Sequence, residues 1–313
     1  MTRDPRPPLL VLFGPTASGK SALAHRVALA RDGEIVSADA FAVYRGFDVG
    51  TAKPGPKERA EVPYHALDVA DPRETYSAGR WAHTAREAIG EIAARGRLPI
   101  VCGGSGFYID ALLKGLPGDE AADAALRRRL SEWGRTRQDE AHRFLALNDP
   151  ESATRIPVGN LRYTLRALEV LLLTGRPASA RRTDRPELLS RFRVVCAGLR
   201  LSREDLHARI AARVREMLDR GWGEEVRHLL GSGLPLEANA FQAIGYREVA
   251  DWVAGRIDRA EAEARIVAST RQLAKRQKTW FARERDAVWL EPDGALEALM
   301  IRLDGPEKTE RNG

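Results

Sequence analysis

Features of membrane-bound, secreted and repetitive proteins are scarce in this sequence. Only two cysteines occur in 313 residues, and because Cys102 and Cys196 each lie in an apolar run, they indicate small core side chains rather than a disulfide or a metal pair. No run approaches 18 consecutive apolar residues, so we expect no membrane span. Residues 1–8 are polar and rich in proline, without the apolar centre of a signal peptide, and no internal repeat is visible. Together these absences predict a cytoplasmic protein.

The size and charge of the chain limit its organisation and its partners. With 313 residues, of which 43% are hydrophobic, it can form one large domain or a core with a smaller second domain. The formal net charge is +6 at pH 7, and the lysines and arginines occur in clusters. Such clusters favour a polyanionic partner, although a solvated basic surface would account for the composition equally well.

The most informative stretch is a phosphate-binding motif near the N-terminus. Five apolar residues, 9–13, predict a buried parallel strand, and residues 21–30 predict a helix. Between them, the glycines of G-x-x-x-x-G-K-S let backbone N–H groups approach a phosphate at the start of the helix. Lys20 would neutralise phosphate oxygens, and the Ser21 hydroxyl suits Mg²⁺. The motif predicts a phosphate site without identifying the ligand. It consists of Gly14, Pro15, Thr16, Ala17, Ser18, Gly19, Lys20 and Ser21.

Two further polar residues follow predicted strands. Asp39 ends the strand pattern of residues 34–39, and Ser105 follows the strand pattern of residues 98–102. Because the carboxyl ends of parallel strands line the ligand crevice, both should lie near the phosphate loop. Asp39 would hold Mg²⁺ through a water, act as a general base, or cap the next turn. Ser105 would orient a substrate, cap a helix, or do both.

Strand and helix patterns alternate along most of the chain and predict its fold. The expected strands are residues 9–13, 34–39, 64–69, 98–102, 193–201 and 288–290, and the expected helices are 21–30, 77–95, 121–137, 138–147, 160–174, 203–220 and 258–284. Alternation stops between about residues 120 and 193, where only helical patterns occur. We therefore predict an α/β fold, with a P-loop NTPase-like parallel sheet core at 1–119 and 191–313 and a helical insertion domain at 120–190.

The last long helix pattern, residues 258–284, is basic. It contains Lys275 and Arg276, and Gln277 and Trp280 follow within the next four residues. This mixture suits contacts to phosphates and bases, although basic helix faces are often only solvated.

Several segments together resemble the tRNA dimethylallyltransferase family. Gly-Thr-Ala-Lys at 50–53 and Gln-Leu-Ala-Lys-Arg-Gln at 272–277 are far more specific than the P-loop. The matching segments span nearly the whole chain in the family's order. They are residues 14–21, 39–53, 103–105, 166–170, 243–247 and 271–280.

The resemblance implies a particular reaction. The P-loop would hold dimethylallyl diphosphate with Mg²⁺, and the dimethylallyl group would pass to the N6 amine of the adenosine on the 3′ side of the anticodon. Asp39 would accept the amine proton, Ser105 would contact the target nucleotide, and Arg209 and Arg213 would contact the diphosphate. The tRNA contacts that the resemblance implies are Asp39, Ala40, Phe41, Ala42, Ser105, Arg127, Arg162, Arg166, Gln242, Gly245, Tyr246, Arg247, Lys275 and Arg276.

The sequence departs from the family at three places. The family usually has Asp-Ser-x-Gln where this chain has Asp-Ala-Phe-Ala at 39–42, so the hydrogen bonds of the Ser and Gln side chains are lost. Ser105 replaces a more usual Thr, and Arg162 is the candidate replacement for an arginine in an Asn-Asp-x-x-Arg pattern. These departures leave the residues of the chemistry in place and affect nucleotide recognition.

Three other functions remain open on the sequence. A small-molecule kinase would need the same loop, Mg²⁺ and arginines, but it leaves the later matching segments unexplained. An isopentenyltransferase acting on free adenylate would need fewer basic residues than this chain has. An RNA-binding protein without activity would not need an intact P-loop and Asp39. We expect a monomer.

Overall fold

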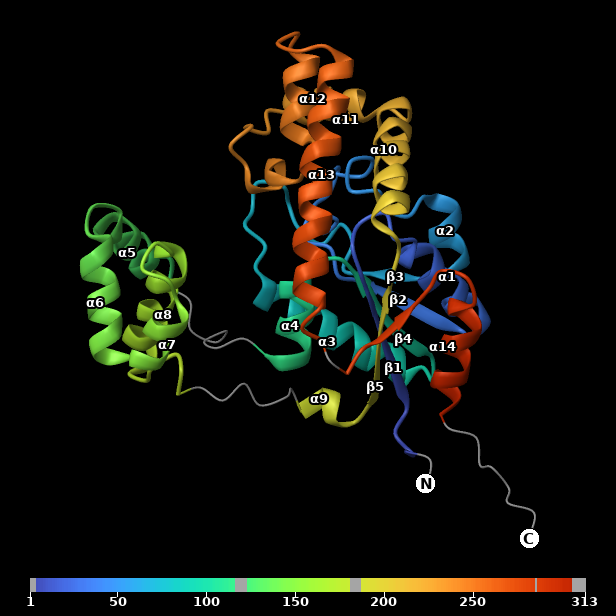
Figure 1. The fold of residues 1–313 in the computed structure, drawn as a ribbon, viewed down its shortest axis with the longest axis horizontal. Coiled ribbons are helices and arrows are strands. Elements are labelled where there is room, and N and C mark those ends of the chain that lie inside the picture. The colour runs from blue at the N-terminus through green and yellow to red at the C-terminus, as the bar shows by residue number, and fades with distance from the viewer. Residues whose placement is uncertain (1–3, 116–122, 181–186, 285, 306–313) are drawn as a thin grey trace. The chain divides into compact units, whose positions relative to one another are not determined.

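The computed structural model describes residues 4–115, 123–180, 187–284 and 286–305 (Figure 1). The chain divides into two compact units, one made of residues 1–112 and 188–313, the other of residues 113–187. The second unit interrupts the first in sequence, as an insertion does, and the insertion was expected at 120–190.

A parallel sheet forms the centre of the first unit. Its described strands are β1 (Pro8–Phe13), β2 (Gly33–Ser37), β3 (Tyr64–His65), β4 (Leu98–Gly103), β5 (Arg193–Leu199) and β6 (Val288–Leu290). Their order is β3-β2-β4-β1-β5-β6, and every neighbouring pair is parallel. The central strand β1 is apolar, and residues 9–13 are fully buried, as their sequence predicts. The predicted parallel sheet is confirmed.

One strand is shorter than the sequence predicts. The pattern at 64–69 forms only the two residues of β3, because Ala66 (φ 58°) and Asp68 (φ 59°) leave the extended region of backbone conformation. The chain then turns instead of continuing along the edge of the sheet.

Helices cover both faces of the sheet. The helices that flank the strands along the chain are α1 (Lys20–Ala30), α2 (Pro56–Glu61), α3 (Ala78–Ala94), α4 (Gly106–Lys114), α9 (Glu187–Ser190) and α14 (Ala295–Asp304). Apolar residues of α1 and α14, among them Leu23 and Leu299, form one core cluster with Leu10 and Ile100 of the sheet. Helix α3 packs on β2 and β4 and contributes no residue to that cluster, so it covers the opposite face.

A helical layer follows β5 in the same unit. It consists of α10 (Arg203–Asp219), α11 (Trp222–Gly231), the 3₁₀ turn η1 (Asn239–Gln242), α12 (Tyr246–Val253) and α13 (Arg259–Phe281). The Ser202 hydroxyl accepts the N–H of Asp205 at 3.0 Å, as the capping pattern predicts. Leu206 and Ile210 of α10 pack with Ala274 of α13, which joins two helices that are far apart in sequence.

The second unit is helical, as predicted. Its described helices are α5 (Ala124–Thr136), α6 (Gln138–Asn148), α7 (Pro150–Arg155) and α8 (Leu161–Thr174). Ala141, Leu145 and Leu168 form its core. The expected start of the first helix, residues 121 and 122, lies outside the described residues.

Candidate active site

The P-loop joins β1 to α1 with the backbone shape that its glycines allow. Gly19 has φ 93°, a left-handed conformation that favours glycine, and α1 begins at the next residue. The N-terminus of α1 therefore lies at the loop and favours an anion. The Ser18 hydroxyl is buried without a hydrogen bond in the described part of the chain. The predicted order of strand, loop and helix is thus present.

Lys20 is held under the loop. Its Nζ donates to the carbonyl of Pro15 at 3.1 Å, and the residue is 9% exposed. Burial, together with the neighbouring charge of Arg213, lowers the pKa of Lys20 to about 8. A buried ammonium with one neutral partner can still gain stability from an anionic ligand.

Two arginines of α10 add positive charge at the loop. Nη1 of Arg209 lies 3.5 Å from where a Cβ would stand on Gly19. Arg213 is half-buried, and burial lowers its pKa while the charge of Asp39 raises it. Within the described residues neither arginine has an ion-pair partner. The structure thus brings Lys20, Arg209 and Arg213 together as predicted, and the cluster suits a diphosphate.

Two cavities lie on either side of Asp39. One, of about 160 Å³, contains Lys20 and Ser21 in its lining. The other, of about 250 Å³, lies between α10 and α13 and is lined by apolar side chains such as Ile210 and Ile266. Some residues line both cavities and so stand between them: Thr16, Asp39, Thr51, Arg213 and Leu273.

The Asp39 carboxylate is fixed by its own turn. Its Oδ1 accepts the N–H groups of Phe41 at 2.8 Å and Ala42 at 3.1 Å. The capping role proposed from the sequence is therefore present. Oδ2 has no hydrogen-bond partner in the described ranges of the chain, so one carboxylate oxygen remains for a substrate or metal ion.

Ser105 connects the end of β4 to the Asp39 turn. Its backbone carbonyl accepts the N–H groups of Tyr108 and Ile109, so the residue stands at the start of α4. Its hydroxyl oxygen accepts the N–H of Ala40 at 3.0 Å. The hydroxyl hydrogen is then available to a substrate in the crevice.

Helix α13 supports the P-loop through one side chain. Gln277 Oε1 accepts the N–H of Thr16 at 2.8 Å, and its Nε2 donates to the carbonyl of Gly104 at 2.9 Å. A Cβ on Gly104 would lie 2.4 Å from that Nε2, so only glycine permits this approach. Trp280 similarly donates to Asp110 at 3.0 Å. Gln277 and Trp280, for which the sequence suggests contacts to RNA, each have a hydrogen-bond partner inside the protein.

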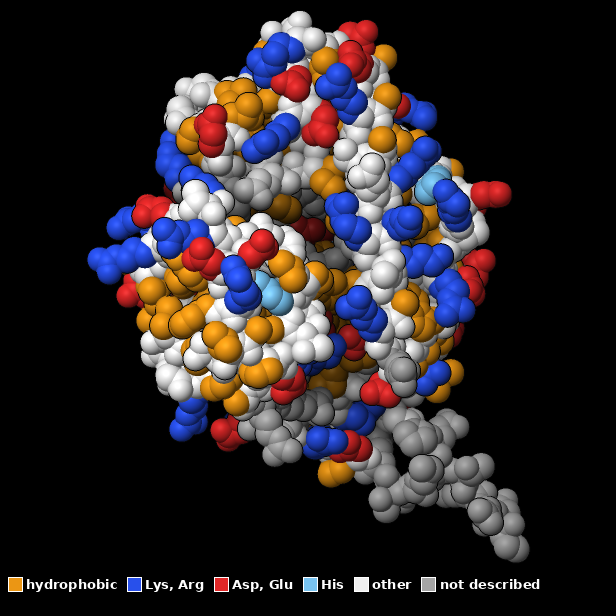
Figure 2. All heavy atoms as spheres, turned by 60° about the vertical axis from the view of Figure 1, so that its left-hand side comes forward, with side chains coloured by type: hydrophobic (Ala, Val, Ile, Leu, Met, Phe, Trp, Pro, Cys, Tyr) orange, Lys and Arg blue, Asp and Glu red, His pale blue; other side chains and the backbone are white. Residues whose placement is uncertain are grey.

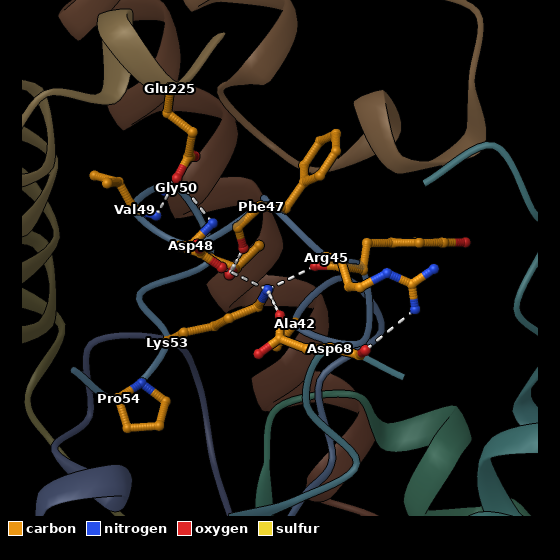
Figure 3. A network of polar contacts seen from close by, with 12 residues as sticks. Ala42, Arg45, Phe47, Asp48, Val49, Gly50, Lys53, Pro54, Asp68 and Glu225 are labelled. Atoms are coloured by element: carbon orange, nitrogen blue, oxygen red, sulfur yellow. Dashed lines mark hydrogen bonds and ion pairs between the residues drawn. The ribbon is translucent and has the colours of Figure 1, made fainter. Parts of the chain in front are cut away.

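The loop at residues 47–54 is anchored by Lys53 (Figure 3). Nζ of Lys53 donates to the carbonyl of Tyr44 at 2.6 Å, to Asp48 at 2.7 Å and to Asp68 at 2.6 Å. The Lys53 side chain is 1% exposed. Although burial raises the pKa of Asp68, its hydrogen bonds from Lys53 and Arg59 lower it overall. Lys53 of the Gly-Thr-Ala-Lys segment therefore stabilises the loop, because its ammonium group is taken up by three internal acceptors.

The residues with an expected tRNA role in the first unit differ in exposure. Lys275 and Arg276 of α13 are exposed, and the side chain of Ala42 is buried. Phe41 lines the apolar cavity. Among the other expected contacts, Gln242 and Arg247 are exposed, whereas Gly245 and Tyr246 are buried.

Tyr246 is fully buried and donates to Glu225 at 2.6 Å. Burial, followed by the charge of Glu225, raises the pKa of Tyr246 well above its usual value. A Cβ on Gly245 would lie 2.1 Å from the Trp222 ring. Both residues therefore pack the interior, and neither presents a side chain to RNA.

In the second unit, two expected tRNA contacts share one carboxylate. Glu169 is 1% exposed and accepts Arg127 at 3.0 Å and Arg166 at 2.7 Å. Burial raises the pKa of Glu169, but the hydrogen bonds from the two arginines lower it overall. Arg162 is exposed. Lys and Arg side chains are spread across the face of the protein drawn in Figure 2, with Asp and Glu side chains between them.

The site offers few protein ligands for a metal ion. Within the described ranges, no group of three His, Cys, Asp or Glu side chains could hold one. Ser21 and Asp39, however, line the same cavity and offer two oxygen atoms. That set fits Mg²⁺, which usually keeps waters and phosphate oxygens as its other ligands. Across the described helices, none is long and apolar enough to cross a membrane.

A P-loop at the carboxyl edge of a parallel sheet, with a helical layer beside it, defines a P-loop NTPase-like α/β protein. The model of the IPP transferase family matches residues 42–284, and the chain belongs to this family. It is 44% identical to tRNA dimethylallyltransferase 1 of Pelobacter propionicus over 292 residues, which cover 93% of this chain and 94% of that protein.

Two solved structures are similar in fold. The tRNA delta(2)-isopentenylpyrophosphate transferase of Staphylococcus epidermidis is 33% identical with a TM-score of 0.68, covering 96% of this chain and all of that one. A eukaryotic dimethylallyltransferase acting on tRNA is 27% identical with a TM-score of 0.82, covering 97% of this chain and 82% of that one.

Proposed function

We propose that the protein transfers the dimethylallyl group of dimethylallyl diphosphate to the N6 amine of the adenosine on the 3′ side of the anticodon in tRNA, releasing diphosphate. Membership of the IPP transferase family supports tRNA prenylation. The position of Asp39 carries the mechanism, because this carboxylate lines both the P-loop cavity and the second cavity. A donor in one and an adenine in the other would meet beside it.

The donor side stabilises the leaving group. As the bond between the allylic carbon and the diphosphate oxygen breaks, negative charge grows on the diphosphate. Lys20, Arg209 and Arg213 lie where they would neutralise it, together with the N–H groups of the loop. Ser21 would hold Mg²⁺, with waters and diphosphate oxygens as its other ligands, and the charge of the ion would further stabilise the leaving diphosphate.

The acceptor side removes a proton. The N6 amine of adenine is a weak nucleophile because its lone pair is delocalised into the ring. As N6 bonds to the allylic carbon, Asp39 would take one amine proton, with its Oδ1 held by two N–H groups and its Oδ2 facing no other partner in the described chain. The Ser105 hydroxyl would help to orient the base.

The tRNA supplies binding energy that a free nucleotide lacks. The target adenine must leave the stacked anticodon loop, which costs a few kcal/mol. We propose that exposed Lys275 and Arg276, with the basic residues of the inserted unit, contact tRNA phosphates and offset this cost. A free adenylate would lack these contacts, so it should be a poor acceptor.

One assay tests the proposal. The protein is incubated with dimethylallyl diphosphate, Mg²⁺ and an unmodified anticodon stem-loop, and the nucleosides are analysed by mass spectrometry. We expect one dimethylallyl group on the adenosine 3′ of the anticodon, with little product from AMP. Equal prenylation of AMP would favour the free-adenylate alternative, and phosphoryl transfer from ATP to a small acceptor would favour the kinase alternative.

A further inference from the structure

The loop at residues 47–54 forms part of the wall of both cavities. Gly50 and Thr51 line the apolar cavity, and Thr51 and Lys53 line the P-loop cavity. Between them, Ala52 has φ 49°, a left-handed conformation that costs energy for a residue with a Cβ. Such a backbone persists only where its surroundings hold it in place. Lys53 holds one end of this loop.

Glu225 of α11 holds the other end (Figure 3). Its Oε2 accepts the N–H groups of Asp48 at 2.8 Å and Val49 at 2.6 Å. Its Oε1 accepts the hydroxyl of Tyr246 at 2.6 Å and the N–H of Gly50 at 3.4 Å. Both oxygens of one carboxylate are therefore used by the loop and by its neighbour on α12. Hydrogen bonds to a charged acceptor are stronger than those between neutral groups.

The indole of Trp222 fixes the depth of the same loop. A Cβ on Gly50 would lie 2.3 Å from Trp222 Nε1, so the loop backbone already rests against the ring. Trp222 and Glu225 both belong to α11, so the hydrogen bonds to Glu225 keep the loop backbone close to this helix, and the Trp222 ring limits how close it comes. Thr51, which lines both cavities, directly follows the residues held in this way.

We propose that Glu225 is a positioning residue for the transfer reaction. By holding the N–H groups of residues 48–50, it sets the wall between the donor and acceptor cavities, and with it the approach of the adenine amine to the allylic carbon. This inference rests on the proposed prenyl transfer. It assigns to Glu225 an effect on turnover without contact with either substrate.

The variant Glu225→Gln tests the assignment. Glutamine has a similar size but no charge and only one acceptor oxygen, so an NH₂ donor would replace one of the two oxygens that now accept loop N–H groups. We expect kcat to fall by roughly 10²-fold, the size typical of a misplacement of about 1 Å between reacting groups. The KM for dimethylallyl diphosphate should change little. Glu224→Gln is the matched control, because Glu224 is exposed and pairs only with Arg227 in the described chain.

Hydrogen exchange distinguishes loop release from general destabilisation. In Glu225→Gln, the amides of residues 48–50 should exchange faster, while those of β1 and β4 keep their protection. If Glu225→Gln does not fold, Tyr246→Phe, which removes one hydrogen bond to Oε1, should give a smaller loss of kcat in the same direction.

Two results would overturn the assignment of Glu225. One is turnover within twofold of the wild type despite faster exchange at residues 48–50. The other is loss of activity only in proportion to a global loss of exchange protection. If the wild-type protein prenylates no RNA, the proposed function fails instead, and this outcome is seen without any variant.

Discussion

The side chain of Gln277 on α13 accepts the N–H of Thr16 in the P-loop, 261 residues earlier in the chain. Its amide nitrogen simultaneously donates to Gly104 at the end of β4. The Gln277 side chain therefore ties the P-loop and the end of β4 to helix α13. Changes in α13 will be felt at the phosphate site even though α13 supplies no group to the chemistry.

Replacing Gln277 with alanine should weaken donor binding. The N–H of Thr16 and the carbonyl of Gly104 would lose their partner, which costs about 1–3 kcal/mol of unfolding free energy. The KM for dimethylallyl diphosphate should rise more than the KM for RNA. Steady-state kinetics and thermal unfolding measure both effects. Gln272→Ala, on an exposed position of the same helix, should behave as the wild type.

Asp39→Asn should abolish most turnover without disturbing the fold. The asparagine oxygen can still accept the N–H groups of Phe41 and Ala42, but it cannot take a proton. Turnover should fall by about 10²–10⁴-fold, with RNA affinity nearly unchanged. Single-turnover rates and stem-loop binding provide the measurements, with Asp32→Asn as an exposed control. Near-normal turnover of Asp39→Asn would rule out the general base.

The affinity for pyrophosphate should fall as the pH rises through about 8, where Lys20 loses its proton. Protonated Lys20 attracts the pyrophosphate anion. At pH values above the pKa of Lys20 in the free protein, binding therefore requires Lys20 to take up a proton. For one group the affinity falls by up to about tenfold per pH unit. Calorimetry at several pH values measures it. Lys20→Arg stays charged, so it corrects for the ionisation of pyrophosphate itself; parallel curves for the two proteins would contradict the role of Lys20.

Arg127→Ala should destabilise the inserted unit as well as weaken RNA binding. Removing one of the two arginines on buried Glu169 leaves this carboxylate less compensated, at a cost of about 1–3 kcal/mol. A second change, Glu169→Gln, should recover part of the stability. A double-mutant cycle followed by thermal unfolding checks this, and additive effects of the two changes would refute the coupling.

Arg276→Ala should weaken stem-loop binding and leave donor affinity unchanged. Arg276 is exposed, and within the described chain it has no ion-pair partner. The affinity for RNA should fall steeply with salt, and the slope of log K against log salt should decrease by about 0.7–0.9 for each phosphate that the variant no longer neutralises. Fluorescence anisotropy over a salt series measures the slope. Lys57→Ala on α2 is an exposed control, and an unchanged slope for Arg276→Ala would exclude an interaction of this side chain with phosphate.

The elements that the sequence predicts correctly are those whose residues are neighbours along the chain. The strand, loop and helix around Lys20 follow one another directly, so the 13 residues from Leu9 to Ser21 are enough to predict their arrangement. The apolar pattern of β1 likewise predicts a buried parallel strand, as the structure shows. The short helices α2 and α7 have no apolar face, so the sequence does not predict them.

The roles of several motif residues depend on tertiary contacts and could not be predicted. The family segments at Lys53, Tyr246 and Gln277 indicate important positions, but the sequence does not reveal that their partners are interior groups. Lys53 meets two carboxylates, and Tyr246 meets Glu225, which lies outside the resemblance segments. The sequence gives one indication that Glu225 is important. It lies among apolar residues of α11, where a charged side chain needs a partner.

The strand order also has a consequence for synthesis of the chain on the ribosome. The P-loop strand β1 lies between β4 and β5, so one side of it stays unpaired until the chain has been made as far as Leu199. The partner of the Thr16 N–H arrives later still, with Gln277. A nascent chain will therefore carry its phosphate motif early but complete the contacts of that motif only after Gln277 has been made. Until then β1 has an open edge that is able to pair with other chains.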